Sequence, residues 1–170
     1  DAALRWAESL PPPTFDAVVS TFDSLNHVMT TSGLGKVFER VYACLRPGGI
    51  FVFDLNREEA YRDSWIKTGA TVTDQLISVS QGAYLADRRL AICDITLMRQ
   101  HRGVWERSDF QLRQKLHPSP AVLARLRAAG FEASVHDAAA LGMRGEIGRG
   151  RDFFVAKKLR QRRSGQRAIR

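Results

Sequence analysis

The sequence predicts an α/β fold in which a parallel sheet with a crossover helix is followed by a separate antiparallel sheet. Two short apolar runs rich in valine and phenylalanine, Phe15–Phe22 and Ile50–Leu55, have the length and composition of buried strands. Between them, apolar residues recur at offsets of three and four, which predicts a helix with one buried face: Leu34, Val37, Phe38, Val41 and Leu45. A strand, a helix and a second strand at this spacing form a right-handed crossover unit with parallel strands.

Local signals set the expected bounds of this first unit. Ser32 is a plausible N-cap for the helix. Pro47, Gly48 and Gly49 are expected to end it and to turn the chain into the second strand.

Polar side chains follow both predicted strands at the points where they end. Asp23, Ser24, Asn26 and His27 come after the first strand, and the range 56–57 (Asn, Arg) comes after the second. In open parallel sheets, ligands bind beyond the carboxyl ends of the strands. Polar groups gathered there cost stability unless solvent or a ligand satisfies them. The sequence therefore predicts one site formed by both strand ends.

The next part of the chain changes character. Arg57–Trp65 is expected to form a short helix over the site. Residues 71–116 then show β-rich, roughly alternating patterns. We predict three antiparallel strands separated by turn signals at Gln81-Gly82 and His101-Arg102-Gly103, with the strands at Thr71–Ser80, Leu90–Met98 and Val104–Leu116.

The last part of the chain is expected to form a helix followed by a closing hairpin. Ser119-Pro120 begins a helix as its N-cap and first turn, and Gly130 ends it. Strands are predicted at Phe131–Ala138 and Asp152–Lys157. The glycines between them, from Gly142 to Gly150, are read as a hairpin loop, with a phosphate cradle as the alternative.

Composition restricts the class of protein. A chain of 170 residues with 44% hydrophobic and 26% charged residues can form one domain with a core. Cys44 and Cys93 lie in apolar stretches and are expected to be reduced core residues. No metal-site spacing, membrane-spanning stretch or signal-peptide pattern is visible, so we expect a cytoplasmic protein without a bound metal or a membrane partner.

The net charge of +8 comes mostly from one end of the chain. Residues 157–170 carry seven basic side chains and no acid. We expect residues 1–156 to form the folded domain and residues 157–170 to form a solvated, disordered tail. The alternative is that this tail binds nucleic acid, which we do not expect elsewhere in the chain.

The two central motifs resemble a known family. FDAVVSTFDSLNHV followed by LRPGGIFVFDLN is similar to the fourth strand, fourth helix and fifth strand of class I S-adenosylmethionine-dependent methyltransferases, especially the small-molecule branch. The resemblance runs from Asp1 to about Lys158. It implies an incomplete Rossmann-like sheet of the last four strands, with an antiparallel closing strand, and an inserted antiparallel sheet that covers the substrate.

The resemblance also implies what the chain lacks and which residues act. The acidic glycine-rich loop and the ribose-binding acid of the family are not found, so the chain looks like a carboxy-terminal portion. The implied residues are Asp1, Phe22, Asp23 and Ser24 for the cofactor S-adenosylmethionine, His27 for catalysis, and Asn26, His27, Asn56, Arg57, Trp105 and Arg107 for a small-molecule methyl acceptor.

Structural roles remain open for several of these residues. Asn26 and His27 could cap the loop that follows, Asp54 could hold backbone amides, and Asp1 could be a solvated terminus. The polar face of the inserted sheet, with Trp105 and Arg107, could line a pocket or simply face water.

Other functions also remain open. They are a fragment without cofactor binding, a nucleic-acid-binding module that uses the basic tail, and a nicotinamide-dependent oxidoreductase, although the last lacks its glycine fingerprint. Without the upstream strands, one edge of Phe15–Phe22 would be open and apolar, which predicts self-association through that edge.

Overall fold

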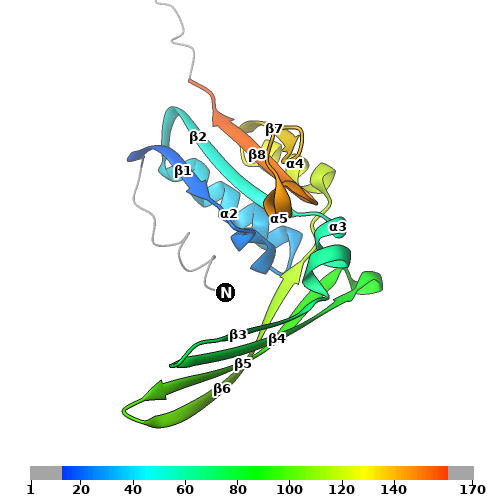
Figure 1. The fold of residues 1–170 in the computed structure, drawn as a ribbon. Helices are drawn as coiled ribbons and strands as arrows, with labels where there is room; N and C mark the ends of the chain where they lie inside the picture. The colour runs from blue at the N-terminus through cyan, green and yellow to red at the C-terminus, as the bar shows by residue number, and fades with distance from the viewer. Residues whose placement is uncertain (1–12, 161–170) are drawn as a thin grey trace, which may run out of the picture.

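The computed structural model describes residues 13–160, without the side chains of residues 146 and 147, and contains two four-stranded sheets (Figure 1). The first sheet has the order β1 (Phe15–Ser20), β2 (Leu45–Asn56), β8 (Arg151–Lys158) and β7 (Phe131–Asp137). The second has the order β3 (Thr68–Val72), β4 (Leu76–Leu85), β5 (Leu90–His101) and β6 (Val104–Lys115). We refer to the second as the inserted sheet. It lies across the end of the first sheet at which β1 and β2 finish (Figure 1).

The pairing in the first sheet confirms the predicted crossover unit. β1 pairs with β2 in parallel, with Val19 opposite Val52. β8 is antiparallel to both of its neighbours, β2 and β7, as the prediction of an antiparallel closing strand requires. Among the strands of residues 13–160, β1 pairs with β2 alone. The open edge is therefore present in the described part of the chain, whereas self-association through it remains a prediction.

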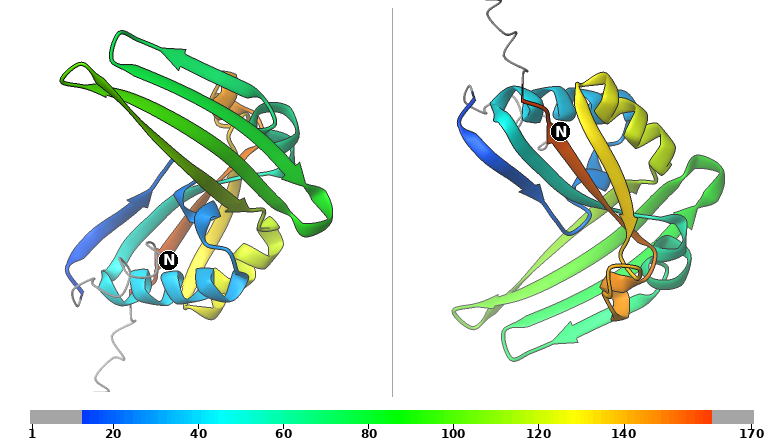
Figure 2. Two further views of the ribbon diagram at one scale, coloured as in Figure 1. Left: turned by 90° about the horizontal axis from the view of Figure 1, so that it is seen from below. Right: turned by 90° about the horizontal axis from the view of Figure 1, so that it is seen from above.

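Helices α2 (Thr31–Cys44) and α4 (Ser119–Ala128) pack on the same face of the first sheet (Figure 2). The apolar face of α2 that the sequence predicts is fully buried there. Phe38 lies between two residues of β2, with ring centroids 6.2 Å from Phe51 and 5.4 Å from Phe53. Val122 and Leu126 of α4 complete this core.

The bounds of α2 differ from those predicted. Thr30, rather than Ser32, is the N-cap, and its hydroxyl oxygen accepts from the Gly33 amide at 3.0 Å. The helix ends at Cys44, before the predicted stop at Pro47. Leu45 is already extended and paired with Phe15, so the residues after it belong to the irregular start of β2.

The first strand is shorter than predicted, and the reason is a backbone turn. Phe22 and Asp23 both have positive φ angles, 58° and 50°, which extended strands do not contain. This turn leads into the short 3₁₀ helix η1 (Ser24–His27), so the polar residues after β1 fold back across the end of the sheet.

The inserted sheet has four strands where the sequence predicts three. The predicted strand Thr71–Ser80 is in fact a hairpin, because the Thr73 hydroxyl oxygen accepts from the amide of Leu76 at 3.0 Å and reverses the chain. The range 81–82, predicted as a turn, lies inside β4. The turn at His101–Gly103 is confirmed, with positive φ angles at its last two residues.

Short helical segments connect several of the strands. After β2 come α3 (Glu58–Ala60) and the π-helix η2 (Tyr61–Trp65), in agreement with the predicted helix over the site. The 3₁₀ turn η3 (Ala86–Arg88) joins β4 to β5. The glycine-rich loop between β7 and β8 contains the short helix α5 (Gly145–Gly148). Pro118, one residue before the predicted Ser119, is the N-cap of α4.

The predicted boundary of the basic tail is too early by two residues. Lys157 and Lys158 belong to β8 and pair with Glu132 and Phe131 of β7. The remainder of the tail from residue 161 lies outside the described residues, and so do residues 1–12 with Asp1. Within 13–160, the helices are too short and polar to cross a membrane.

Lys158 stabilises the carboxyl end of α2, which leads to a testable expectation. Its Nζ donates to the carbonyls of Tyr42 (2.7 Å) and Leu45 (2.8 Å) and lies 4.4 Å from the centre of the Tyr42 ring. Lys158→Met should lower the free energy of unfolding by about 1–2 kcal/mol, since two charge-assisted bonds at a helix C-terminus are lost. Urea denaturation measures this, with the exposed neighbour Lys157→Met as the control. An equal loss in both variants would contradict this role.

Candidate functional site

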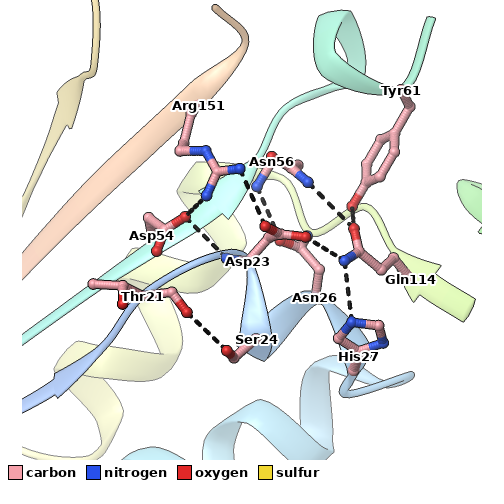
Figure 3. A network of polar contacts seen from close by, with 10 residues as sticks. All are labelled: Thr21, Asp23, Ser24, Asn26, His27, Asp54, Asn56, Tyr61, Gln114 and Arg151. Atoms are coloured by element: carbon pink, nitrogen blue, oxygen red, sulfur yellow. Dashed lines mark hydrogen bonds and ion pairs between the residues drawn. The ribbon is translucent and has the colours of Figure 1, made fainter. Parts of the chain in front are cut away.

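The ends of β1 and β2 meet at one edge of the first sheet, where their polar residues form a connected group. We call this group the strand-tip cluster; it consists of Asp23, Asn26, His27, Asp54, Asn56, Tyr61, Gln114 and Arg151 (Figure 3). The turn after β1 brings the Asp23 amide to the Asp54 carboxylate at the end of β2, where it donates to Oδ2 at 3.0 Å. Asp54 therefore holds a backbone amide, which is the structural role considered for it from the sequence.

A single guanidinium joins the two strand ends. Arg151, the first residue of β8, donates through NH1 to Asp54 and through NH2 to Asp23, the latter at 3.1 Å. The side chain of Asp54 is 1% exposed, and those of Arg151 and Asp23 are 13% and 18% exposed. Two carboxylates and one guanidinium leave an excess of negative charge at this edge of the sheet.

Gln114 connects the inserted sheet to the same cluster. It lies near the end of β6 and is 1% exposed. Its amide nitrogen donates to the Asp23 carboxylate and lies 3.2 Å from Nε2 of His27. Its amide oxygen accepts from Asn56 Nδ2 at 3.2 Å and from the Tyr61 hydroxyl at 3.1 Å.

Both asparagines of the cluster have structural bonds. Asn26 is fully buried; its Nδ2 donates to the carbonyl of Lys115 at 3.0 Å, and its Oδ1 accepts from the Asn56 amide at 2.9 Å. Asn26 thus ties the turn after β1 to both β2 and β6.

Tyr61 is buried above the cluster and stacks on Tyr84, with ring centroids 5.3 Å apart. Burial, with the Asp23 charge as the second cause, raises the pKa of Tyr61, which stays protonated and able to donate.

His27 lies beside the end of β6, where it contacts Arg113 and Gln114. Its Nδ1 is 2.8 Å from the carbonyl oxygen of Arg113, which can only accept, so this nitrogen carries a proton. The ring is partly exposed, whereas Asn26 beside it is not. Since His27 and Asn56 both contact Gln114, the structure brings together residues from the two predicted strand ends.

Other predicted site residues have different surroundings. Phe22 sits on the turn after β1 and is 72% exposed. The Ser24 hydroxyl donates to the carbonyl of Thr21 at 2.7 Å. Arg57 pairs with Asp137 at 2.7 Å and lies 3.6 Å from Asp152. The pKa of Asp137 is lowered by its bond from the Ala139 amide and by the Arg57 charge, so Arg57 has a firm partner within the fold.

Trp105 and Arg107 are not brought to the strand-tip cluster. They lie near the β5–β6 turn, seven or more positions along β6 from Gln114. At about 3.3 Å per residue, Trp105 lies roughly 30 Å along the strand from Gln114. Arg107 pairs instead with Asp109 at 2.9 Å on the opposite face of the sheet. Together with the Thr96 hydroxyl, Arg107 lowers the pKa of that exposed carboxyl.

Three members of the cluster were not identified from the sequence: Tyr61, Gln114 and Arg151. Arg151 had a signal, because it is a cation directly before a predicted strand and directly after the glycine-rich loop. Gln114 had one in the alternation of β6, where it is a polar residue that follows Phe110 and Leu112 on the same face. Neither signal names the partner, since the pairs are separated by 91 and 128 residues in sequence.

The cluster borders a cavity of about 210 Å³, whose lining residues are Asp23, Asn56, Ala60, Ser64, Trp65 and Arg151. A larger hollow of about 460 Å³ lies on the inserted sheet and is lined mainly by the face that carries Gln81, Asp94 and Asp109. Because Gln114 alternates onto the other face, this hollow is separate from the strand-tip cluster. Within residues 13–160, no group of three histidine, cysteine or acidic side chains is placed to bind a metal ion.

A buried histidine beside the site gives a pH-dependent expectation. His117 Nε2 is 2.8 Å from the carbonyl of Val28 at the end of η1, and burial lowers its pKa below 6.5. Below that pH the unfolded chain binds a proton that the folded chain excludes. As the pH is lowered from about 6.5 toward the lower pKa of the folded state, the free energy of unfolding should therefore decrease by up to about 1.4 kcal/mol per pH unit.

His117→Gln should reduce this slope, because the amide can donate to the same carbonyl without titrating. Urea midpoints between pH 7.5 and 5 in the two proteins measure the difference. His101→Gln, at the exposed β5–β6 turn, is the matched control and should keep the original slope. An unchanged slope in His117→Gln would exclude this histidine as the cause.

Comparisons with known proteins find similar sequences and folds among methyltransferases. No protein-family model matches the sequence. A protein of Bacillus subtilis named "Putative methyltransferase YqeM" is 27% identical over 121 residues, covering 69% of this chain and 48% of its own length. An S-adenosylmethionine-dependent methyltransferase from Clostridium acetobutylicum has a TM-score of 0.70 at 18% identity, covering 90% of this chain and 62% of that one. The sugar N-methyltransferase KedS8 from Streptoalloteichus has a TM-score of 0.68 at 19% identity, with 86% and 57% covered.

These comparisons show which fold the chain has and how much of the related proteins it spans. At identities below 25%, the solved structures show that this chain shares their architecture. The chain spans about half the length of the curated relative and about three fifths of the two solved structures.

Proposed function

Because this chain has the fold of class I S-adenosylmethionine-dependent methyltransferases, we propose that it supplies part of an enzyme that transfers a methyl group to a small-molecule acceptor. The observation that carries this proposal is the strand-tip cluster. Asp23, His27 and Asn56 come from the ends of two neighbouring parallel strands and share one buried partner, Gln114. Ligands bind at this edge in open parallel sheets.

The chemistry of the cluster suits the cofactor. S-adenosylmethionine, when bound, supplies a methyl group attached to a positively charged sulfur. The carboxylates of Asp23 and Asp54 exceed the single charge of Arg151, so this edge favours a cation. Phe22, largely exposed beside Asp23, offers an aromatic surface next to it. Phe22, Asp23 and Ser24 are therefore proposed to border the cofactor; Asp1, proposed by resemblance, lies outside the described residues.

The acceptor side is proposed to be the cavity beside the cluster. Trp65 and Asn56 line it together with Asp23. Methyl transfer depends mainly on alignment and exclusion of water, which buried walls and fixed polar groups provide. His27 is proposed to orient an acceptor hydroxyl or amine and to hold its proton at Nε2. Asn26 and Arg57 act indirectly in this proposal, since their bonds fix the ends of the strands.

A small molecule is favoured as the acceptor over a macromolecule. The cavity of about 210 Å³ is an open hollow lined by the strand ends and η2, and its size suits a compact group. The name of KedS8 describes a sugar as its acceptor. Trp105 and Arg107 lie too far along β6 to contact a compact acceptor at the cluster, so the proposal gives them no role there.

The second candidate is a fragment that does not bind the cofactor by itself. It is favoured by the share of the curated relative that the chain spans, which is 48% of that protein. Titration calorimetry with S-adenosylhomocysteine tests the second candidate, because micromolar binding to the 170-residue chain alone would reject it. The first candidate predicts micromolar binding to a longer protein in which this chain is joined to the remaining part of the fold.

The matched variants for the longer protein are Asp23→Asn and Asp109→Asn. Removing the charge at the cluster should weaken binding of S-adenosylmethionine, whose sulfur is positively charged, about tenfold, which corresponds to about 1.4 kcal/mol. Asp109 lies on the other face of the inserted sheet, and its variant should bind as the parent does. Binding of NADH, or no binding of S-adenosylhomocysteine by the longer protein, would reject the proposed function.

A further inference from the structure

The amide of Gln114 uses every hydrogen-bonding position that it has. A glutamine amide offers two donors and two acceptor lone pairs. In Gln114 the donors face Asp23 and His27, and the lone pairs face Asn56 and Tyr61 (Figure 3). A buried amide that is fully bonded in this way is held in a single orientation. It is also the side chain through which the inserted sheet contacts both strand ends.

The neighbours of Gln114 decide which way the amide points. The carboxylate of Asp23 can only accept, so the amide nitrogen must be on that side. The same nitrogen then faces Nε2 of His27 at 3.2 Å and donates its second hydrogen there. Since Nδ1 of His27 donates to the Arg113 carbonyl at 2.8 Å, the ring holds its proton on Nδ1 and a lone pair on Nε2.

We propose that Gln114 is a positioning residue that keeps Nε2 of His27 unprotonated and aimed at the strand-tip cluster, and that this role makes the site dependent on docking of the inserted sheet. Both bonds to the His27 ring come from consecutive residues of β6, the Arg113 carbonyl and the Gln114 amide. Gln114 contacts both His27 and the charged side chain of Asp23. Without the Gln114 hydrogens between them, this carboxylate would favour a doubly protonated, cationic ring.

This inference rests on the proposed methyl transfer, because it concerns the class of acceptor that His27 would bind. An acceptor that carries an O–H or N–H group can share the Nε2 lone pair with the Gln114 N–H, whose nitrogen stays 3.2 Å away. An acceptor group that has no proton to donate, such as a carboxylate, would leave that lone pair facing another lone pair. The acceptor class implied is therefore a hydroxyl or an amine.

The test measures the protonation of the His27 ring nitrogens by NMR in the ¹⁵N-labelled 170-residue chain at pH 7.5. The parent protein should show a protonated Nδ1 and an unprotonated Nε2. Gln114→Glu keeps the two acceptors for Asn56 and Tyr61 but replaces the donors with a second carboxylate. Imidazole is a stronger base than a carboxylate, so Nε2 should gain a proton in this variant.

The matched control is Gln111→Glu on the same strand. Gln111 also donates its amide to an aspartate, Asp94 at 2.9 Å, but it lies on the opposite face of the sheet. This variant should leave the His27 signals unchanged. A protonated Nε2 in the parent protein, or an unprotonated Nε2 in Gln114→Glu, would overturn the proposal. If Gln114→Glu fails to fold, the result in the parent protein still decides.

The outcome is independent of the proposed function, because it needs no cofactor and no acceptor. No binding of S-adenosylhomocysteine by the longer protein, together with the expected His27 signals in the 170-residue chain, would reject the methyltransferase proposal alone. Binding of S-adenosylhomocysteine by the longer protein without the expected His27 signals would reject the role of Gln114 alone.

Discussion

Replacing Arg151 with methionine is expected to lower the free energy of unfolding by about 3–5 kcal/mol, as is usual when one partner of a buried ion pair is removed. Asp54 is 1% exposed, and its carboxylate would lose its cationic partner while staying out of reach of water. Asp23 would lose the same partner, and the turn after β1 would be less firmly held. Urea denaturation followed by circular dichroism measures the loss.

Two further variants separate the effect of charge from that of side-chain size. Arg149→Met changes an exposed arginine two residues earlier and should cost less than about 0.5 kcal/mol. Combining Arg151→Met with Asp54→Asn removes the stranded charge but keeps an oxygen for the Asp23 amide, so part of the lost stability should return. A double variant no more stable than Arg151→Met would show that the buried charge is not the cause.

Gly82→Ala is expected to cost about 3 kcal/mol, at the upper end for an added methyl group in a packed site. A Cβ at this position would overlap the carbonyl oxygen of Trp65 and lie 2.7 Å from its carbon. Backbone cannot move aside as a side chain can, so η2 would be displaced from β4. The bond from Trp65 Nε1 to the Ile92 carbonyl, now 2.9 Å, would be lost with it.

Gly69→Ala is the matched control, because Gly69 also lies in the inserted sheet. A Cβ there meets only the Ser80 hydroxyl at 3.0 Å, and that small side chain can rotate away. Thermal unfolding and Trp fluorescence should show a change in Gly82→Ala and almost none in Gly69→Ala. Equal effects would mean that the approach of Trp65 to β4 has no special cost.

The sequence predicted the first sheet well because its signals are local. Buried strands such as β2 are continuous apolar runs, and the stripe of α2 repeats with the helical period. The crossover rule then fixes how β1 and β2 pair. The order of the polar residues after each strand is also visible in the sequence, which is why His27 and Asn56 could be placed at one site.

The inserted sheet was harder to predict because its local signals are ambiguous. Gly82 looks like a turn residue, yet it lies mid-strand where the backbone of Trp65 approaches too closely for any side chain. Thr73 reverses the chain with a single hydroxyl and has no glycine or proline beside it. Position along a strand also cannot be read from polarity, and this placed Trp105 and Arg107 at the site when they lie near the far turn of β6.

The bonds made by Gln114 have a consequence for protein engineering. The inserted sheet is a continuous segment between two connections, so it could be exchanged for the corresponding sheet of another protein with the same fold. A grafted sheet with an apolar residue at this position would leave Asp23, His27, Asn56 and Tyr61 each short of a partner. Chimeras should therefore succeed only when a carboxamide side chain is retained at the second-to-last residue of β6, whatever the rest of the sheet contains.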